Sequence, residues 1–349
     1  MNSSWLSRQN WAREAARRIP GLSGYERRLG ELHARVAQLE QDKQQLHSGS
    51  PGSSSASDDA ALRAEVARLQ GELDRFTTLW PPGHFYSPYA PLDDVRARAR
   101  EIFERDPADL PGVDLRLDEQ WKRFDQLADT VDLPENQTKG YRYRFENGAY
   151  SYSDATFLHL MLRDVKPSRL IEVGSGWSSA CTLDTIERHL GWSTECTFIE
   201  PYIDGLKNVL GPGDASRIRM IAEPLQNVPL QEFSKLQSGD VLFIDSTHVV
   251  RVGSDVNYLF FSVLPSLNPG VYIHFHDVFP SFEYPLVWIE EGRAWTEQYL
   301  LHGFLQYNDS FSVVLWPGLL MALDVERVYA RYPHCARNQG GSIWLRKER

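Results

Sequence analysis

Short apolar runs alternate with helix-like patterns through the second half of the chain, from about residue 165 onward. Runs rich in valine, isoleucine and phenylalanine are typical of buried strands, and the patterns between them have the spacing of helices. Strands that alternate with helices form a mostly parallel sheet covered on both faces, so we predict an α/β domain over residues 165–349. The predicted strands are RLIEV, CTFIEP, RIRMIAE, DVLFIDS and GVYIHFHD, followed by SFSVVLWP and GSIWLRK, which could run antiparallel.

A different pattern occupies the N-terminal part, where apolar residues recur three and four positions apart from Leu29 to Leu46 and again from Leu62 to Trp80. This spacing is typical of a coiled coil or of two helices that pack as a hairpin. Residues 48–59, rich in glycine, proline and serine, are predicted to form a flexible linker. The two helices either fold back on each other or pair with a second copy of the chain, so a homo-oligomer is one of two open outcomes.

The stretch between these two parts, residues 81–164, begins with the proline-rich and aromatic sequence WPPGHFYSPYAPLDD. A polar helical region is predicted over about residues 93–129. A loop dense in tyrosine then precedes the apolar helix ATFLHLMLRDV, and its aromatic and arginine side chains either line a pocket or simply pack. We therefore expect a helical segment over 1–80, a connecting region over 81–164 and the α/β domain after it.

The composition is that of an ordinary globular protein, with 42% hydrophobic and 24% charged residues in a chain of 349. A net charge of −10 repels polyanions, so we expect no nucleic-acid partner. The N-terminus lacks the apolar run of a signal peptide, and no apolar stretch approaches the roughly 18 residues that span a bilayer. The three cysteines have neither disulfide nor zinc spacing. These features predict a cytoplasmic protein without a membrane span.

The most informative motif is LIEVGSGWSS, an apolar strand that runs into a glycine turn before a helix. Glycines allow a tight turn and let a ligand approach the backbone, and the helix that follows presents free N–H groups. Ser179 stands where the dinucleotide fingerprint has its third glycine, so the motif departs from that fingerprint. The ligand-binding residues predicted at this turn are Glu172, Gly174, Ser175 and Gly176.

An acidic residue, Glu200, ends the next strand in the sequence FIEP. Its distance along the chain from Gly176 is typical of an acid that binds a ribose, because the tip of the second strand faces the glycine turn. We therefore expect Glu200 to accept hydrogen bonds from both hydroxyls of a nucleoside. A helix cap or a solvent-exposed glutamate would give the same sequence pattern.

The motifs IEVGSGWSS, FIEP, GDVLFIDSTHV and HFHDVFPSFEYP, in this order, resemble those of bacterial class I S-adenosylmethionine-dependent methyltransferases, several of which modify glycans or secondary metabolites. The resemblance covers about residues 83–317, including GHFYSP and YSYSDA. It implies a Rossmann-like, seven-stranded, mostly parallel sheet, with S-adenosylmethionine as the cofactor.

The resemblance also implies where each part of the cofactor would lie. The glycine turn would surround the methionine part, Glu200 would hold the ribose, and the segment Glu223–Gln226 would lie near the adenine. The cofactor-binding residues implied in this way are Glu172, Gly174, Ser175, Gly176, Glu200, Glu223, Leu225 and Asp245.

Histidine and aspartate gather at the predicted carboxyl ends of the fourth and fifth strands, where open α/β sheets place their reactive groups. A hydroxyl that accepts a methyl group must lose its proton, and His248 or His276, beside Asp245, is the expected general base. The same side chains could instead bind magnesium, manganese or iron. Related sugar and catechol O-methyltransferases use carboxylates at comparable strand ends, and the histidines here depart from that pattern. The candidate metal ligands are Asp245, His248, His276 and Asp277.

The resemblance therefore implies an enzyme that methylates a hydroxyl group of a small molecule or glycan. Two other interpretations stay open at this point: an iron-dependent oxygenase on a related scaffold, and a non-catalytic adapter that the coiled coil assembles. Further polar and aromatic residues after the fifth strand would form an acceptor pocket or a lid, unless they only pack against the sheet. They are Glu283, Tyr284, Arg293, Trp295 and Glu297.

Overall fold

A computed structural model describes residues 35, 38–39, 64–69, 71 and 83–349. The chain divides into two compact units, Met1–Val95 and Arg96–Arg349. In the first unit, the described residues before Gly83 are helical, and Leu39 and Leu69 are buried. The rest of the predicted coiled coil, with its linker, lies outside the described residues.

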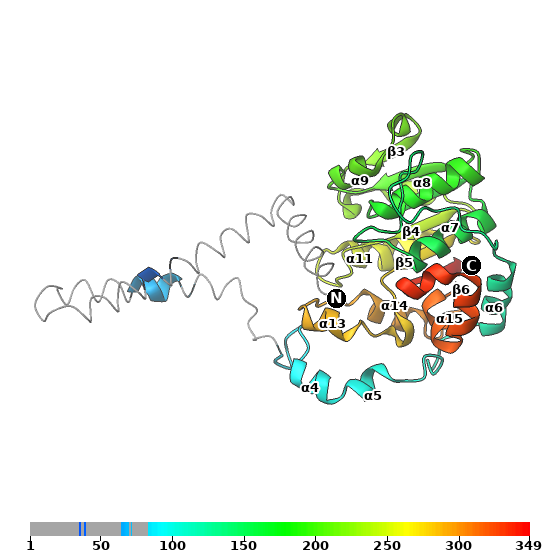
Figure 1. Cartoon of the computed structure of the whole chain (residues 1–349). Coiled ribbons are helices and arrows are strands. Elements are labelled where there is room, and N and C mark those ends of the chain that lie inside the picture. Colours follow the sequence, from blue (N-terminus) through cyan, green and yellow to red (C-terminus); the bar gives the residue numbers. More distant parts are fainter. Residues whose placement is uncertain (1–34, 36–37, 40–63, 70, 72–82) are drawn as a thin grey trace, which may run out of the picture. The chain divides into compact units, whose positions relative to one another are not determined.

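Seven strands form a single sheet in the unit Arg96–Arg349, as the sequence predicts (Figure 1). Their order is β3-β2-β1-β4-β5-β7-β6. Neighbours among β1 to β5 pair in parallel, whereas β7 runs antiparallel to both β5 and β6. The Rossmann-like sheet is thereby confirmed. The strands are β1 (Arg169–Val173), β2 (Glu195–Ile199), β3 (Ile218–Ile221), β4 (Val241–Ile244), β5 (Tyr272–His276), β6 (Phe311–Leu315) and β7 (Ser342–Lys347).

Two buried apolar clusters lie on opposite faces of this sheet, because successive side chains of a strand point to opposite sides. Leu170 and Phe243 belong to the cluster that also contains residues of α7 and α8. Ile171 and Leu242 belong to the cluster that contains residues of α11, η3, α12 and α14. The helices are α4 (Leu92–Ala97), α5 (Ala99–Phe103), α6 (Leu117–Gln126), α7 (Ser153–Val165), α8 (Trp177–His189), α9 (Asp204–Val209), α10 (Leu230–Phe233), α11 (Asp255–Tyr258), η3 (Leu259–Val263), α12 (Leu264–Ser266), α13 (Leu286–Glu290), α14 (Glu297–Leu305), α15 (Pro317–Leu323) and α16 (Val325–Arg331).

The polar region predicted as helical over about 93–129 is interrupted by residues 104–116. Pro107 and Pro111 within this interruption lack the backbone N–H that a helix requires, so the helix cannot continue through them. The prediction of helix was therefore correct at both ends of this region and wrong in its middle. Residues 96–164 lie in the same compact unit as the sheet.

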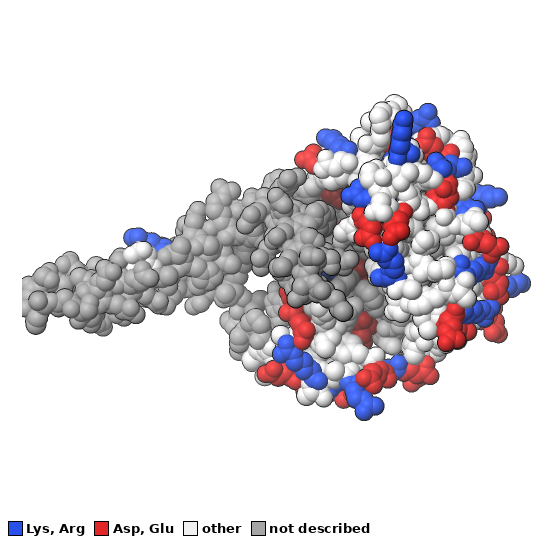
Figure 2. Space-filling view, in the orientation of Figure 1, with Lys and Arg blue, Asp and Glu red and all other residues white. Residues whose placement is uncertain are grey.

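Charged side chains of both signs are interspersed over the described residues on the face drawn in Figure 2. Charged side chains of the described residues also form exposed ion pairs, such as those of Arg337 with Glu135 and Glu146. No helix among the described residues is both long enough and apolar enough to cross a bilayer.

Arg142 lies at the centre of an ion cluster that joins the loop before α7 to the helix α8. Its guanidinium donates to Asp184 at 2.8 Å, to Glu187 at 2.6 Å and to Asp214 at 2.6 Å. Asp184 and Asp214 are almost completely buried, and Asp184 also accepts the backbone N–H groups of Arg142 and Tyr143. The cluster therefore fixes this loop on the first helix after the glycine turn.

We predict that Arg142→Ala lowers the free energy of unfolding by about 3–5 kcal/mol, because two buried carboxylates lose their counter-charge. Denaturant unfolding followed by circular dichroism measures this change. Arg337→Ala is the matched control: Arg337 also pairs with two carboxylates but is 51% exposed, so its loss should cost far less than the loss of Arg142. Equal losses in the two variants would contradict the structural role of Arg142.

Candidate functional site

The turn between β1 and α8 is built on two glycines that do different things. Gly174 has φ +77°, and a Cβ atom there would lie 1.9 Å from the carbonyl oxygen of Asp245. Only glycine lets the turn approach the end of β4 this closely. Gly176 has an extended backbone, and a Cβ atom there would meet nothing within 4 Å. The turn is therefore closed against the sheet at Gly174 and open to a ligand at Gly176.

Glu172 is buried in β1 directly before this turn. One of its carboxylate oxygens, Oε1, accepts hydrogen bonds from the hydroxyls of Ser178 and Ser179 at 2.7 Å. The other oxygen, Oε2, is buried without a partner, and burial raises the pKa of Glu172 to about 8. Ser179, which replaces the third glycine of the dinucleotide fingerprint, also accepts the N–H of Gly176 at 3.0 Å. The departure from that fingerprint thus has a structural role.

Glu200 faces the glycine turn, as the sequence predicts. Its carboxylate accepts the backbone N–H of Ser175 at 3.3 Å and that of Tyr202 at 2.7 Å. Burial raises the pKa of Glu200, while these two N–H groups lower it in part. The hydroxyl oxygen of Ser175 is buried without a hydrogen-bond partner. Polar groups that a ligand could satisfy therefore lie on both sides of the turn.

The segment expected near the adenine forms a short 3-10 turn, η2 (Leu225–Asn227). Leu225 is buried in the same apolar cluster as Ile199. Glu223 is exposed and accepts a hydrogen bond from Asn227 at 3.2 Å, and Gln226 donates to the carbonyl of Gly253. Leu225 could thus provide an apolar surface for a ligand, whereas Glu223 contacts Asn227 of the turn η2.

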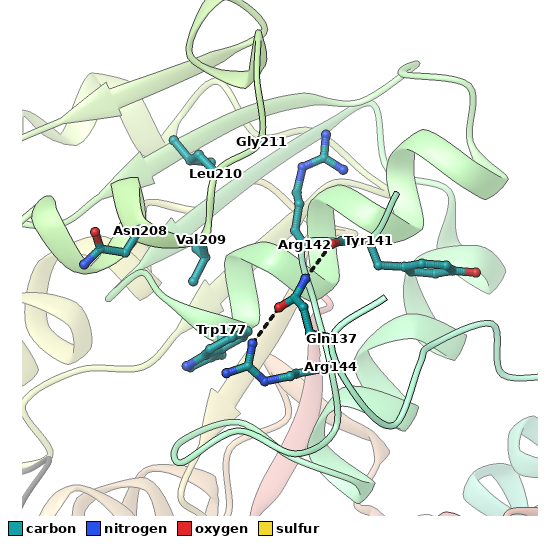
Figure 3. A pocket seen from close by; sticks show the side chains of 9 residues that line it. All are labelled: Gln137, Tyr141, Arg142, Arg144, Trp177, Asn208, Val209, Leu210 and Gly211. Atoms are coloured by element: carbon teal, nitrogen blue, oxygen red, sulfur yellow. Dashed lines mark hydrogen bonds between the residues drawn. The ribbon is translucent and has the colours of Figure 1, made fainter. Parts of the chain in front are cut away.

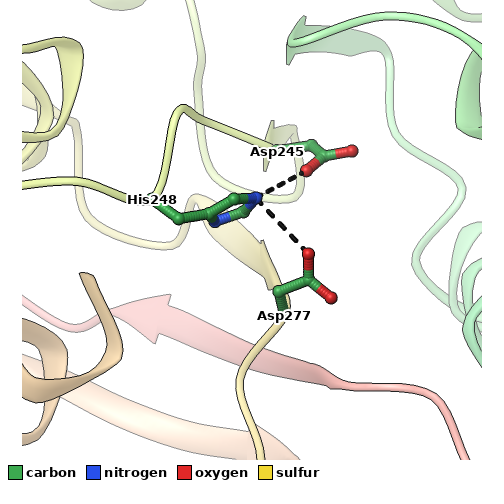
Figure 4. A group of neighbouring side chains, drawn as sticks. All are labelled: Asp245, His248 and Asp277. Atoms are coloured by element: carbon green, nitrogen blue, oxygen red, sulfur yellow. Dashed lines mark ion pairs between the residues drawn. The ribbon is translucent and has the colours of Figure 1, made fainter. Parts of the chain in front are cut away.

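Four predicted site residues meet at the ends of β4 and β5. Nε2 of His248 lies 3.2 Å from Asp245 Oδ1 and 3.4 Å from Asp277 Oδ2 (Figure 4). Nδ1 of His276 lies 3.3 Å from the same oxygen of Asp245 and 3.6 Å from the same oxygen of Asp277. Ligand-type atoms of Asp245, His248 and Asp277 all lie within 4.8 Å of one another. The cluster predicted from the sequence is therefore formed.

Two further carboxylates support the histidines from outside this cluster. His248 Nδ1 lies 2.8 Å from Glu297 Oε2, and His276 Nε2 lies 3.5 Å from Asp154 Oδ2. The sequence placed Glu297 only in a pocket or lid. It gave no role to Asp154, which begins α7 and whose motif YSYSDA was the one available signal. Both carboxylates are buried.

The electrostatics of the cluster follow from burial and from these close pairs. Burial alone lowers the pKa of His248, but Asp245 and Glu297 outweigh it and raise that pKa to about 10. Burial also lowers the pKa of His276, and the nearby aspartates raise it well above its ordinary value. Burial raises the pKa of Asp245, yet the two histidines hold it below the usual range. These shifts favour the charged forms of His248, His276 and Asp245 although the site is largely buried.

His274 does not join the cluster, although it shares a strand with His276. Its ring is completely buried and stacks on Phe243 with centroids 4.2 Å apart. Burial lowers the pKa of His274 well below its ordinary value. His274 therefore packs as a neutral side chain beneath the site.

Aromatic side chains form one wall beside the cluster. The ring of Trp295 lies 4.4 Å from that of His248, and Trp288 contacts Trp295 edge-on at 5.1 Å. Tyr284 packs against both tryptophans, and Arg293 lies over both rings. The rings of Trp288 and Trp295 are partly exposed, whereas Tyr284 is buried. Of the residues expected on the acceptor side, Tyr284, Arg293, Trp295 and Glu297 thus come together near His248, whereas Glu283 accepts a hydrogen bond from Tyr299.

A separate pocket of about 350 Å³ lies beside Trp177, the first residue of α8 (Figure 3). The guanidinium of Arg144 lies 4.6 Å from the Trp177 ring and donates to Gln137 at 2.7 Å. The tyrosine-dense loop before α7 therefore does line a pocket. Its lining residues are Gln137, Tyr141, Arg142, Arg144, Trp177, Asn208, Val209, Leu210 and Gly211.

A family model described as a methyltransferase domain matches residues 171–278. The matched segment runs from β1 through the end of β5 and contains the glycine turn, Glu200 and all four residues of the cluster. Residues 171–278 therefore form a methyltransferase domain. This methyltransferase is 32% identical over 168 residues to an uncharacterized protein of Archaeoglobus fulgidus, which covers 46% of this chain and 74% of that protein.

Solved structures similar to this methyltransferase include a Podospora anserina methyltransferase bound to S-adenosylhomocysteine, with 16% identity, a TM-score of 0.38, and coverage of 78% of this chain and 100% of the other. The O-methyltransferase TomG of Streptomyces achromogenes, involved in tomaymycin synthesis and solved with S-adenosylmethionine, has 15% identity, a TM-score of 0.38, and coverage of 74% and 96%.

We predict that alanine destabilises the protein strongly at Gly174 and hardly at all at Gly176. Gly174→Ala should lower the free energy of unfolding by more than about 3 kcal/mol or prevent folding, because its Cβ would overlap the Asp245 carbonyl oxygen. Gly176→Ala should stay within about 1 kcal/mol of the parent, since its Cβ meets no atom of the protein. Thermal and denaturant unfolding check both. A harmless Gly174→Ala substitution would refute the close approach to β4.

Proposed function

We propose that this methyltransferase transfers the methyl group of S-adenosylmethionine to a hydroxyl oxygen of a small molecule or glycan. One observation carries the proposal: the Glu200 carboxylate lies against the open glycine turn, which itself touches the end of β4 at Asp245. An acid in this position is suited to accept hydrogen bonds from both ribose hydroxyls. The polar cluster then lies where open α/β sheets gather their reacting groups.

The polar groups left unsatisfied around the turn fit a ligand of this kind. Glu172 Oε2 and Ser175 Oγ are buried without partners, and such atoms cost free energy until a ligand or water satisfies them. We assign Glu172, Gly174, Ser175 and Gly176 to the methionine part of the cofactor. S-adenosylmethionine, when bound, supplies a methyl group on a positively charged sulfur. Buried carboxylates near the turn favour a cation at this place.

We assign the segment Glu223–Gln226 to the adenine. Leu225 offers a buried apolar side chain at the end of β3, and apolar contacts are typical of pockets that hold planar rings. Glu200, at the end of the neighbouring strand β2, would then hold the ribose between the adenine and the turn.

The acceptor hydroxyl must lose its proton as its oxygen bonds to the methyl carbon and the carbon–sulfur bond breaks. His248 and His276, with Asp245 between them, are the candidate proton acceptors. Each accepts a proton only in its neutral form, which its raised pKa makes the minor form at neutral pH. Asp245 is the most accessible of the four, with 31% of its side chain exposed, so an entering hydroxyl would meet it first. A divalent metal ion, either magnesium, manganese or iron, is the alternative way in which the same residues would bind the acceptor oxygen.

The aromatic wall favours a ring-shaped acceptor. Trp288 and Trp295 present partly exposed rings next to His248, and such rings stack on planar or sugar rings of a ligand. The family match favours this enzyme over an iron-dependent oxygenase. A non-catalytic adapter is disfavoured because it would have no use for six buried or half-buried polar side chains at one end of the sheet.

We predict that Glu200→Gln weakens binding of S-adenosylhomocysteine by about 10–100-fold, because charge-assisted hydrogen bonds to the ribose are lost. Isothermal titration calorimetry measures the affinity. Glu195→Gln is the matched control, since Glu195 starts the same strand at its far end and its side chain is 67% exposed. Unchanged affinity in Glu200→Gln would remove the ribose assignment.

We propose in addition that the predicted helices of residues 1–80 pair between two copies of the chain. Deletion of these residues should then reduce the mass in solution from that of a dimer to that of one chain, because the apolar seam is removed. Light scattering coupled to gel filtration measures the mass, and S-adenosylhomocysteine affinity serves as the folding control. The same number of chains per particle before and after deletion would favour the intramolecular hairpin.

A further inference from the structure

The pocket beside Trp177 shares no lining residue with the groups assigned to methyl transfer. Its volume of about 350 Å³ is within the range of pockets that hold small organic molecules. Three segments build it: the loop of residues 137–144, the first residue of α8, and the chain from the end of α9 to Gly211. In Figure 3, Gln137 and Arg144 lie on one side of the pocket, and Asn208 lies on the other.

The lining of this pocket carries positive charge and no negative charge. Two of its residues are arginines, and none is an aspartate or a glutamate. The guanidinium of Arg142 already pairs with three carboxylates. Arg144 is half-buried, and it donates instead to two neutral oxygens, Gln137 Oε1 at 2.7 Å and the carbonyl oxygen of Glu146 at 2.8 Å. The described part of the chain gives Arg144 no carboxylate partner, so its charge is available to an anionic ligand.

The other lining groups suit an organic ring. The ring of Trp177 is partly exposed, and the Arg144 guanidinium lies 4.6 Å from its centre. Val209 and Leu210 add apolar side chains that pack against the buried cluster on this face of the sheet. Asn208 adds an exposed amide. A cation beside aromatic and apolar side chains matches a planar ring that carries a negatively charged group.

The loop that carries Arg144 is fixed before any ligand enters. The backbone N–H groups of Arg142 and Tyr143 donate to the buried carboxylate of Asp184 on α8. Beyond Arg144, the N–H of Phe145 donates to the carbonyl of Pro134 at 2.9 Å. A pocket that is formed in advance loses little conformational freedom on binding, so a small number of contacts can give a measurable affinity.

We propose that this pocket binds a small aromatic carboxylate, with its carboxylate at the Arg144 guanidinium and its ring against Trp177 and Val209. The planar fork of a guanidinium matches the two oxygens of a carboxylate, and the amides of Gln137 and Asn208 supply further polar contacts. A bare inorganic anion would leave the apolar side of the pocket unused. The ligand is neither the methyl donor nor the acceptor, so this inference goes beyond the proposed function and does not rest on it.

Calorimetric titration of the full-length protein with sodium 2-naphthoate tests the proposal, and 2-naphthamide and sodium phosphate are the comparison ligands. We expect a Kd for naphthoate at least about tenfold lower than for the amide, because the amide has the same ring without the charge. Phosphate should also bind at least about tenfold more weakly, because it has no ring. The proposal is wrong if naphthoate does not bind, or if the amide or phosphate binds as tightly.

Variants test whether the naphthoate lies in this pocket. Arg144→Gln should weaken naphthoate binding by at least about tenfold, since the charged donor is lost. Asn208→Asp should also weaken it, because a like charge is added at an exposed position of the same size, and binding of the uncharged amide should stay within about threefold. Arg327→Gln is the matched control: Arg327 lies 4.2 Å over the ring of Trp121, outside the pocket. Unchanged naphthoate affinity in both pocket variants would overturn the proposal.

S-adenosylhomocysteine separates this pocket from the site of the proposed function. A saturating concentration should change the naphthoate affinity by less than about threefold, because the two sites share no lining residue. Displacement of naphthoate would overturn the inference, since the pocket would then belong to the cofactor site. The three variants should keep the parent's melting temperature, which shows that they fold. A parent protein that binds naphthoate but not S-adenosylhomocysteine would refute the proposed function and leave this inference standing.

Discussion

The close approach of Gly174 to the carbonyl of Asp245 is the constraint on which the arrangement of the site depends. The Asp245 N–H donates to Val173, and the Gly174 N–H donates to Ile199, so the turn is tied to both neighbouring strands. This places the start of α8, the acid at the end of β2 and the polar residues at the ends of β4 and β5 along one edge of the sheet. A side chain at Gly174 would separate these parts, because nothing larger than glycine fits.

The site has two halves, the glycine turn and the ends of β4 and β5, and they differ in the groups that hold their carboxylates. Carboxylates near the glycine turn are held by serine hydroxyls and backbone N–H groups, whereas Asp245 and Asp277 at the ends of β4 and β5 pair with histidines. Hydrogen bonds to neutral donors suit a site that receives a cationic ligand through one exposed side. Histidines supported by outer carboxylates suit a site that holds a metal ion. The two halves meet at Asp245, which contacts the turn through its backbone and the histidines through its side chain.

Local patterns in the sequence were sufficient to predict the parallel part of the sheet, because each of those strands is a continuous apolar run between turn residues. Glu172, Glu200 and Asp245 could be assigned to strand ends for the same reason. The insertion of β7 between β5 and β6 could not be predicted, since antiparallel pairing at the edge of a sheet depends on how distant segments pack. The break over 104–116 was missed although its prolines were visible.

The outer partners of the histidines were the least predictable part of the site. Asp154 precedes β1 and Glu297 follows β5, so neither has a fixed sequence spacing to His248 or His276. Ordinary helix starts often carry an acidic residue, and Asp154 and Glu297 lie in the first turns of α7 and α14, so their residue type alone indicated no further role. Only the folded chain shows that these carboxylates turn inward to a histidine.

A crystal structure of the protein with S-adenosylhomocysteine tests the central claim, that the nucleoside binds across the glycine turn beside the polar cluster. The account predicts both ribose hydroxyls within about 3.2 Å of the Glu200 carboxylate and the sulfur directed toward Asp245. A ligand bound elsewhere, for instance in the pocket beside Trp177 and Arg144, with Glu200 still held only by Ser175 and Tyr202, would contradict it.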